Sequence, residues 1–130
     1  MIKPNISFDH VHVLSPDPKA TADWYVEKLE GQVQRSVEVK GAPQIYVEFT
    51  GGTIIIRGER DGETAGEKTE PAWGTDHFGF RVEGDFDNFC RDLKEKGVSF
   101  TVEPFDFNPT TRIAFIEDPD GVKIELLQRK

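Results

Sequence analysis

The sequence has little cysteine and no long apolar segment. Its one cysteine, Cys90, allows no internal disulfide bond. Because Cys90 falls on the apolar side of an expected helix, we expect a buried and unreactive thiol. No stretch approaches the roughly 18 consecutive apolar residues that a membrane-spanning helix needs. The first residues, Met1 to Asn5, lack the charged and apolar regions of a secretion signal, which favours a cytoplasmic protein.

Positive charge is also scarce. Lysine and arginine together number 16 against 24 aspartates and glutamates, for a formal net charge of −8. Nucleic acids and anionic membrane surfaces are bound by clustered basic residues, so we expect neither as a partner. A small molecule is the expected ligand. The length of 130 residues and the apolar content of 36% fit a single domain, residues 1–130.

The order of expected secondary structure occurs twice along the chain. The first copy, residues 6–57, begins with a strand at 8–14 and a helix from Pro18 that Asp17 caps. Its remaining strands are expected at about 33–40, 43–50 and 53–57. The polar segment 58–74 has no clear period, which is typical of a linker.

The second copy, residues 75–130, has the same order. It begins with a strand at 76–82 and a helix that Asp85 caps. Three strands follow, at about 98–103, 111–117 and 122–128. Gly31 and Gly97 are expected to end the two helices in the left-handed conformation. Asp9–His10 and Asp76–His77 give both first strands the same dipeptide.

One helix cannot cover both faces of the sheet in such a module. Two modules side by side can, which predicts an α+β fold. We expect two tandem βαβββ modules that form a curved eight-stranded open barrel, with the helices on its convex side. The concave side would then contain the functional site.

Alternation of side chains along each strand separates an apolar face from a mixed polar face. The expected polar faces contain His10, His12, Tyr46, Glu48, His77, Arg81 and Glu125. Each of these residues alone is more commonly an ordinary surface residue. However, each copy supplies one histidine on its first strand and one glutamate on a later strand. Two imidazoles and two carboxylates suit Zn²⁺, Ni²⁺, Mn²⁺, Fe²⁺ or Co²⁺.

Four stretches give the chain a family resemblance: residues 8–11 followed by Trp24-Tyr25, residues 46–50, residues 74–78 and residues 115–126. Together they resemble the vicinal oxygen chelate superfamily, which includes glyoxalases, bleomycin resistance proteins and dioxygenases. Within it, the chain is most similar to bacterial glyoxalase I. The resemblance implies one divalent metal ion per site, with the four ligands His10, Glu48, His77 and Glu125. It also implies a homodimer, and leaves open whether the ligands come from one chain or from two.

The resemblance further implies a lyase or isomerase that moves a proton next to a metal-bound carbonyl or enediolate. Glu125 and Glu48 are then the candidate bases, and His12 is a further candidate acid–base group. An anionic substrate is expected to contact one or more of four residues: Tyr46, Arg57, Arg81 and Arg112.

Two positions depart from glyoxalase I. Leu14 and Gly52 stand where that enzyme has an arginine and an asparagine that contact glutathione, which argues against a glutathione adduct. The alternatives within the superfamily are an iron-dependent extradiol dioxygenase, an acyl-CoA epimerase, a fosfomycin-type thiol transferase and a non-enzymatic drug-binding module. The dioxygenase needs only the two histidines and Glu125. The drug-binding module lacks metal ligands, so the four candidate ligands argue against it.

Overall fold

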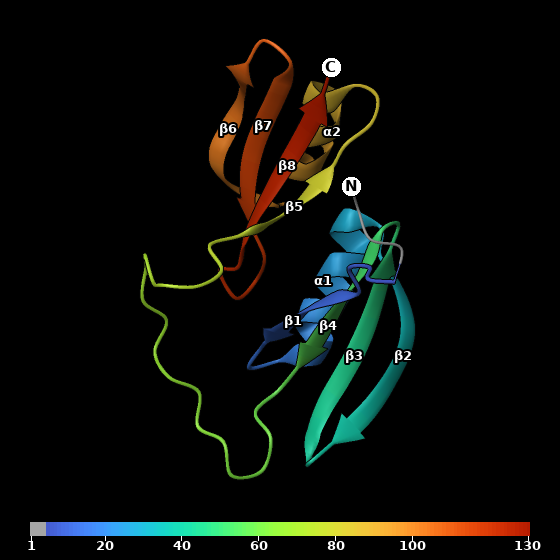
Figure 1. Cartoon of the computed structure of the whole chain (residues 1–130), viewed down its shortest axis with the longest axis vertical. Helices are drawn as coiled ribbons and strands as arrows, with labels where there is room; N and C mark the ends of the chain where they lie inside the picture. Colours follow the sequence, from blue (N-terminus) through green and yellow to red (C-terminus); the bar gives the residue numbers. More distant parts are fainter. Residues whose placement is uncertain (1–4) are drawn as a thin grey trace. The chain divides into compact units, whose positions relative to one another are not determined.

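The computed structural model describes residues 5–130, and residues 1–4, on which most of the expectation about a secretion signal rests, lie outside that range. The chain divides into two compact units, Met1–Gly66 and Glu67–Lys130. Within residues 5–130, each unit has one helix and four strands in the order strand, helix, three strands (Figure 1). The predicted α+β class and tandem βαβββ modules are therefore confirmed. In residues 5–130 the strands form two curved sheets of four strands each, rather than one sheet of eight.

The first unit begins with strand β1 and helix α1. Its elements are β1 (His10–Leu14), α1 (Pro18–Leu29), β2 (Gln32–Val39), β3 (Ala42–Phe49) and β4 (Gly52–Arg57). The sheet order is β1-β4-β3-β2, with β1 parallel to β4 and the other pairs antiparallel. Strand β4 therefore lies between the strands that carry the candidate ligands of this unit.

The second unit repeats this topology. Its elements are β5 (Phe78–Arg81), α2 (Phe86–Glu95), β6 (Ser99–Asn108), β7 (Thr111–Glu117) and β8 (Lys123–Arg129). The sheet order is β5-β8-β7-β6, with β5 parallel to β8. Strand β6 is longer than expected, and it continues through three irregularities in its pairing with β7. Register shifts of this kind, β-bulges among them, let a strand continue while its pairing changes.

Both helices begin where the sequence predicts. The side chain of Asp17 accepts a hydrogen bond from the backbone N–H of Ala20 at 3.1 Å, and Asp85 accepts one from Asn88 at 3.0 Å. Each carboxylate thus satisfies a backbone donor that has no partner inside the helix. Pro18 occupies the first turn of α1, where the missing N–H is harmless.

The helix ends were predicted correctly in only one unit. Gly97 adopts the expected left-handed conformation with φ of 85°. After α1, however, Glu30 adopts this conformation with φ of 63°, so the prediction for Gly31 was wrong. Gly31 is required for packing instead, because a Cβ atom there would lie 2.5 Å from Val47 Cγ1 and 2.7 Å from Phe49 Cζ.

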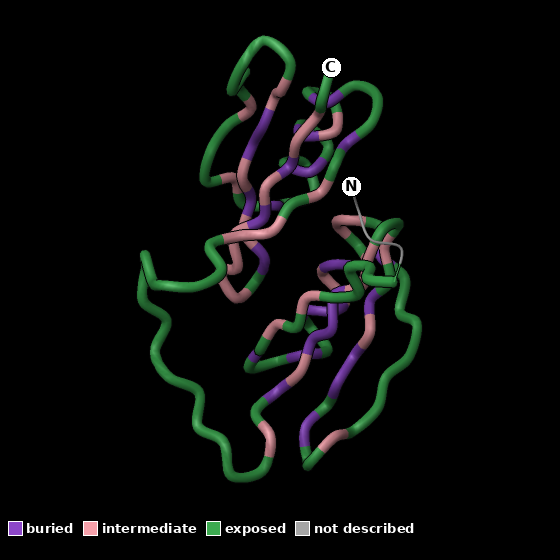
Figure 2. The backbone as a smooth tube through the Cα atoms, viewed as in Figure 1, coloured by how far each residue is buried: buried purple, intermediate pink, exposed green. Residues whose placement is uncertain are grey.

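Each unit buries one face of its sheet against its helix (Figure 2). In the first unit the core consists mainly of Ala22, Tyr25, Ile45, Val47, Ile54 and Ile56. In the second it consists mainly of Phe86, Cys90, Leu93, Ala114, Ile116, Ile124 and Leu126. Burial raises the pKa of the Cys90 thiol to about 11, which fits the expected unreactive thiol. Within residues 5–130, neither helix has the length and apolar character needed to cross a membrane.

We predict that Gly31→Ala lowers the free energy of unfolding by about 1–3 kcal/mol, because the added methyl group overpacks the contact with Val47 and Phe49. Urea denaturation followed by circular dichroism measures the change. Gly66→Ala is the matched control, since a Cβ at Gly66 would meet nothing within 4 Å. Equal midpoints for the two variants would show that Gly31 is not needed for packing.

Candidate functional site

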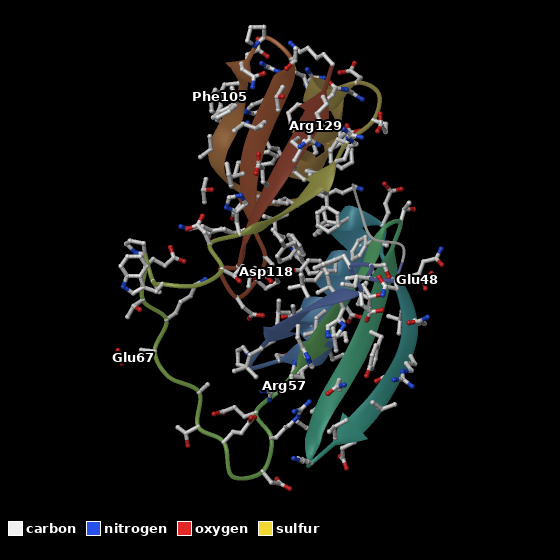
Figure 3. The ribbon with its side chains drawn as sticks, in the orientation of Figure 1. Glu48, Arg57, Glu67, Phe105, Asp118 and Arg129 are labelled. Atoms are coloured by element: carbon white, nitrogen blue, oxygen red, sulfur yellow. The ribbon has the colours of Figure 1, made fainter. Side chains whose placement is uncertain are left out.

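The face of the first sheet opposite α1 carries His10 and Glu48. In the strand register, His10 on β1 is the partner of Thr53 on β4, and Thr53 is in turn the partner of Glu48 on β3. Residues in register on neighbouring strands project from the same face of a sheet. His10 and Glu48 therefore share one face, with Thr53 between them. Figure 3 labels Glu48 on β3 and Arg57 on β4.

His10 is oriented by the residue before it. Its Nδ1 atom lies 2.7 Å from Oδ2 of Asp9, which assigns Nδ1 as the donor and directs Nε2 to another partner. The ring of His12 lies 6.0 Å from the ring of His10 in an edge-on arrangement. Both histidines are exposed, so they are accessible to a ligand.

The second unit brings its two candidate ligands into direct contact. Nε2 of His77 lies 3.0 Å from Oε1 of Glu125, and Nδ1 lies 2.8 Å from Oδ2 of Asp76. The ring of Phe115 packs edge-on against His77, with 4.9 Å between centroids. Asp76 therefore holds the imidazole at Nδ1, and Nε2 lies next to the Glu125 carboxylate.

This arrangement fits a divalent metal ion. A histidine that binds a metal commonly donates its second N–H to a carboxylate, as both His10 and His77 do to the preceding aspartate. Within residues 5–130, however, no group of three or more histidine, cysteine, aspartate or glutamate side chains is close enough together to hold a metal ion. Of the four predicted ligands, each unit contributes one histidine and one glutamate.

The two carboxylates do not occupy equivalent places in the two units. Glu125 lies on β8, beside the strand that follows His77, and its partner in register is Gly79. The position equivalent to Gly79 in the first unit is His12, whose partner on β4 is Ile55. The equivalent of Glu125 is therefore Ile55, and Glu48 lies one strand farther away, on β3.

The environments of His77 and His12 shift their pKa values in opposite directions. The hydrogen bond to Asp76 raises the pKa of His77, and Glu125 adds to this effect against the opposing influence of burial. For His12, desolvation lowers the pKa, and the positive charges of Arg57 and Arg60 lower it further. His12 is therefore the stronger candidate for a neutral imidazole at pH 7.

The predicted substrate-binding arginines lie in three different settings. Arg57 shares the face of His10 and His12, and its two terminal nitrogens contact Glu63 at 2.5 and 3.2 Å. Arg81 is exposed on the same face of its sheet as His77. Arg112 projects from the opposite face, where it pairs with Asp87 of α2 and with Asp106. Arg112 therefore lies on the opposite face of the sheet from Glu125.

Tyr46 belongs to a polar network that the sequence did not reveal. Nε2 of Gln44 donates to the Tyr46 hydroxyl at 2.8 Å, and Oε1 of Gln44 accepts from Arg60 at 2.7 Å. The guanidinium of Arg35 lies 4.2 Å from the centre of the Tyr46 ring. Hydrogen bonds from Arg35 and then from Gln44 lower the pKa of the Tyr46 phenol.

Sequence reasoning missed Arg35 and Arg60 for identifiable reasons. The partner of Arg35 is Tyr46, but β2 has a bulge between Val33 and Arg35 that changes which residues face the site. Arg60 falls in the segment expected to be a linker. The repeated Asp-His dipeptide was the available signal for the positioning roles of Asp9 and Asp76.

Comparison with known proteins accounts for this repeated architecture. The model of the glyoxalase/bleomycin resistance protein/dioxygenase superfamily matches residues 7–126. The chain belongs to this superfamily. The resemblance drawn from the sequence is thereby confirmed.

The relatives include an enzyme and several solved structures. A probable lactoylglutathione lyase from Synechocystis is 42% identical over an alignment of 66 residues, which covers 43% of this chain and 50% of that protein. The chain thus matches about half the length of this curated relative. A glyoxalase family protein from Enterococcus faecalis is 28% identical with a TM-score of 0.71, covering 91% of this chain and 94% of that one. A glyoxalase I mutant from Zea mays is 26% identical with a TM-score of 0.76, covering 92% and 43%.

We predict that His77 keeps its proton to a higher pH than a free histidine in the metal-free protein, whereas His12 loses its proton at a lower pH. A two-dimensional NMR titration of the three histidines measures both values. In Asp76→Asn the pKa of His77 should fall, and that of His12 should not change. A pKa of His77 below that of His12 in the wild-type protein would contradict the structure.

Proposed function

We propose that this protein is a divalent-metal-dependent, glyoxalase-like lyase or isomerase that moves a proton next to a carbonyl or enediolate group. The proposal rests mainly on the contact between His77 and Glu125, with Asp76 bound to the other nitrogen of the imidazole. This contact places an oriented imidazole nitrogen beside a carboxylate, and both groups can bind a metal ion.

The proposed metal ligands are His10, Glu48, His77 and Glu125, one histidine and one glutamate from each unit. Their nitrogen and oxygen donors suit Ni²⁺, Zn²⁺, Mn²⁺, Fe²⁺ or Co²⁺. When bound, such an ion supplies positive charge that stabilises an oxyanion developing on the substrate. We propose that the protein is a homodimer, so that the two pairs come either from one chain or from two copies of it.

Proton transfer is assigned to this chain's own carboxylates. A C–H bond beside a carbonyl is weakly acidic, and a glutamate close to it can accept the proton and return it to the neighbouring carbon. Glu125 and Glu48 are the proposed bases. His12 lies two residues beyond His10 on the same face, and its lowered pKa leaves it neutral and able to accept a proton at pH 7.

The substrate we propose is a small carbonyl compound with an anionic group. The name of the Synechocystis relative includes glutathione. In this chain, however, Leu14 and Gly52 provide no charged or amide side chain at the two positions that resemble the glutathione contacts of glyoxalase I. We therefore propose a substrate other than a glutathione adduct, handled in the cytoplasm.

A second reaction class is favoured by the place of Ile55. Ile55 occupies the position in the first unit that is equivalent to Glu125 in the second. A metal site built only from equivalent positions of the two units would therefore have three ligands: His10, His77 and Glu125. Two histidines and one carboxylate form the ligand set of many iron-dependent oxygenases. An extradiol ring-cleaving dioxygenase is therefore the second candidate, with Glu48 outside the ligand set.

The metal content of purified protein tests the proposal. We predict about one divalent ion per chain in the wild type, measured by plasma mass spectrometry after dialysis without chelator. Glu125→Gln should lose most of this metal, because the amide is a weaker ligand than the carboxylate. Glu38→Gln is the matched control and should retain the metal. Glu38 is an exposed glutamate on β2, opposite Pro43, and it is not one of the proposed ligands.

The Glu48→Gln variant separates the two reaction classes. The lyase proposal expects loss of metal in Glu48→Gln, together with isomerisation by the wild type of a small carbonyl compound that carries an anionic group. The dioxygenase expects retained Fe²⁺ in Glu48→Gln and oxygen consumption with a catechol. Wild-type protein that binds none of Ni²⁺, Zn²⁺, Mn²⁺, Fe²⁺ or Co²⁺ would overturn both and leave the non-enzymatic binding module.

A further inference from the structure

We propose that Arg35, Tyr46 and Arg60 form a subsite for an oxyanion, a carboxylate or phosphate group of the substrate. All three residues belong to the first unit. This inference deepens the proposed function, on which it rests for the identity of the bound molecule. It assigns two arginines that the sequence did not single out, and it specifies the anionic end of the substrate.

The buried side chain of Gln44 connects the three residues. Gln44 is only 7% exposed, although its side chain is polar. Its amide N–H donates to the Tyr46 hydroxyl oxygen, and its amide oxygen accepts from Nη2 of Arg60. Because both ends of the amide are engaged, Gln44 fixes the positions of the phenol and the guanidinium relative to each other.

The cluster has more donors than acceptors. The Tyr46 oxygen already accepts a hydrogen bond from Gln44, so its own O–H is left to donate. Nε of Arg60 is buried and has no hydrogen-bond partner. A buried donor without an acceptor is costly, which indicates that an acceptor is missing at this place.

The missing acceptor should also be negatively charged. In the part of the chain that the structure describes, the side chains of Arg35 and Arg60 form no ion pair with a carboxylate, whereas the neighbouring Arg57 pairs with Glu63. Arg35 contacts the neutral Tyr46, and Arg60 contacts the neutral Gln44. An oxyanion supplies both the charge and several lone pairs.

The subsite lies close to the candidate ligands of the same unit. Tyr46 and His12 are both partners of Ile55 in the strand register, so these three residues form one row across the sheet. The next row on the same face consists of His10, Thr53 and Glu48. Successive rows on one face of a sheet are separated by two residues, about 7 Å. A substrate with its oxyanion at the subsite would thus place a carbonyl near His10 if a short carbon chain joins the two groups.

Anion binding to the metal-free full-length protein tests this inference. The probes are sodium phosphate and sodium acetate, titrated in the presence of EDTA at constant ionic strength maintained with NaCl. We follow the Nε–Hε resonances of the arginines by NMR. Saturable shifts of the Arg35 and Arg60 resonances are expected with at least one probe. Arg60→Gln should weaken binding at least tenfold.

Two further variants complete the design. Tyr46→Phe removes only the O–H and should also weaken binding, while its near-ultraviolet circular dichroism shows whether the fold is retained. Arg91→Gln is the matched control and should bind as the wild type does, because Arg91 lies on α2 and contacts Asn88. Shifts with phosphate alone would identify a phosphate group, and shifts with acetate would identify a carboxylate.

The inference is overturned if neither anion shifts these resonances, or if Arg60→Gln binds as tightly as the wild type. Because EDTA removes metal ions, these results do not depend on the metal site. Failure of anion binding and failure of metal binding are therefore distinguishable.

Discussion

Each unit is stabilised by the burial of one sheet face against a single helix, and this burial determines which residues face outward. In each unit the helix and every second residue of the central strands form the core, with Val47, Ile54 and Ile56 in the first unit and Ile116, Ile124 and Leu126 in the second. Because side chains alternate along a strand, the residues between them must project from the other face. This places His10, Glu48 and Glu125 where a ligand can reach them. The same core determines where glycine is required, as at Gly31.

Much of the fold could be predicted because its signals are local. Asp17 and Asp85 cap helices within three residues of themselves, and Gly97 ends α2 through its own φ angle. Gly31 could not be predicted correctly, because its role depends on Val47 and Phe49, which are distant in sequence. The irregular pairing that lets β6 extend to Asn108 also depends on a partner strand.

The candidate site was predictable only in part, because it too depends on contacts between residues that are distant in sequence. Alternation along each strand indicated which residues share a face, and it correctly grouped His77 with Glu125. It did not indicate which strands are neighbours. The parallel pairing of β1 with β4 places Thr53 between His10 and Glu48 and gives Ile55 the place that Glu125 has in the second unit. Arg35 lies opposite Tyr46 because the register between β2 and β3 shifts, and Arg60 reaches Gln44 from the segment after β4, so no pattern in the sequence pointed to either arginine.

The two units arrange their candidate residues differently, so they are suited to different roles. The second unit has an imidazole and a carboxylate already in contact, with Asp76 and Phe115 fixing the ring. In the first unit, Thr53 of β4 lies between His10 and Glu48, and a group of hydrogen-bond donors surrounds Tyr46. Under the proposed function, the second unit would mainly supply metal ligands, and the first would combine ligands with recognition of the substrate's anionic end.

X-ray absorption spectroscopy of the zinc-loaded protein counts the imidazoles around the ion. If His10 and His77 bind the same ion, the spectrum should show two imidazole nitrogens at about 2.0–2.1 Å together with carboxylate oxygens. His77→Gln should reduce the count to one. A zinc environment with one imidazole or none in the wild-type protein would contradict the claim that the repeated Asp-His strands supply the two halves of one metal site.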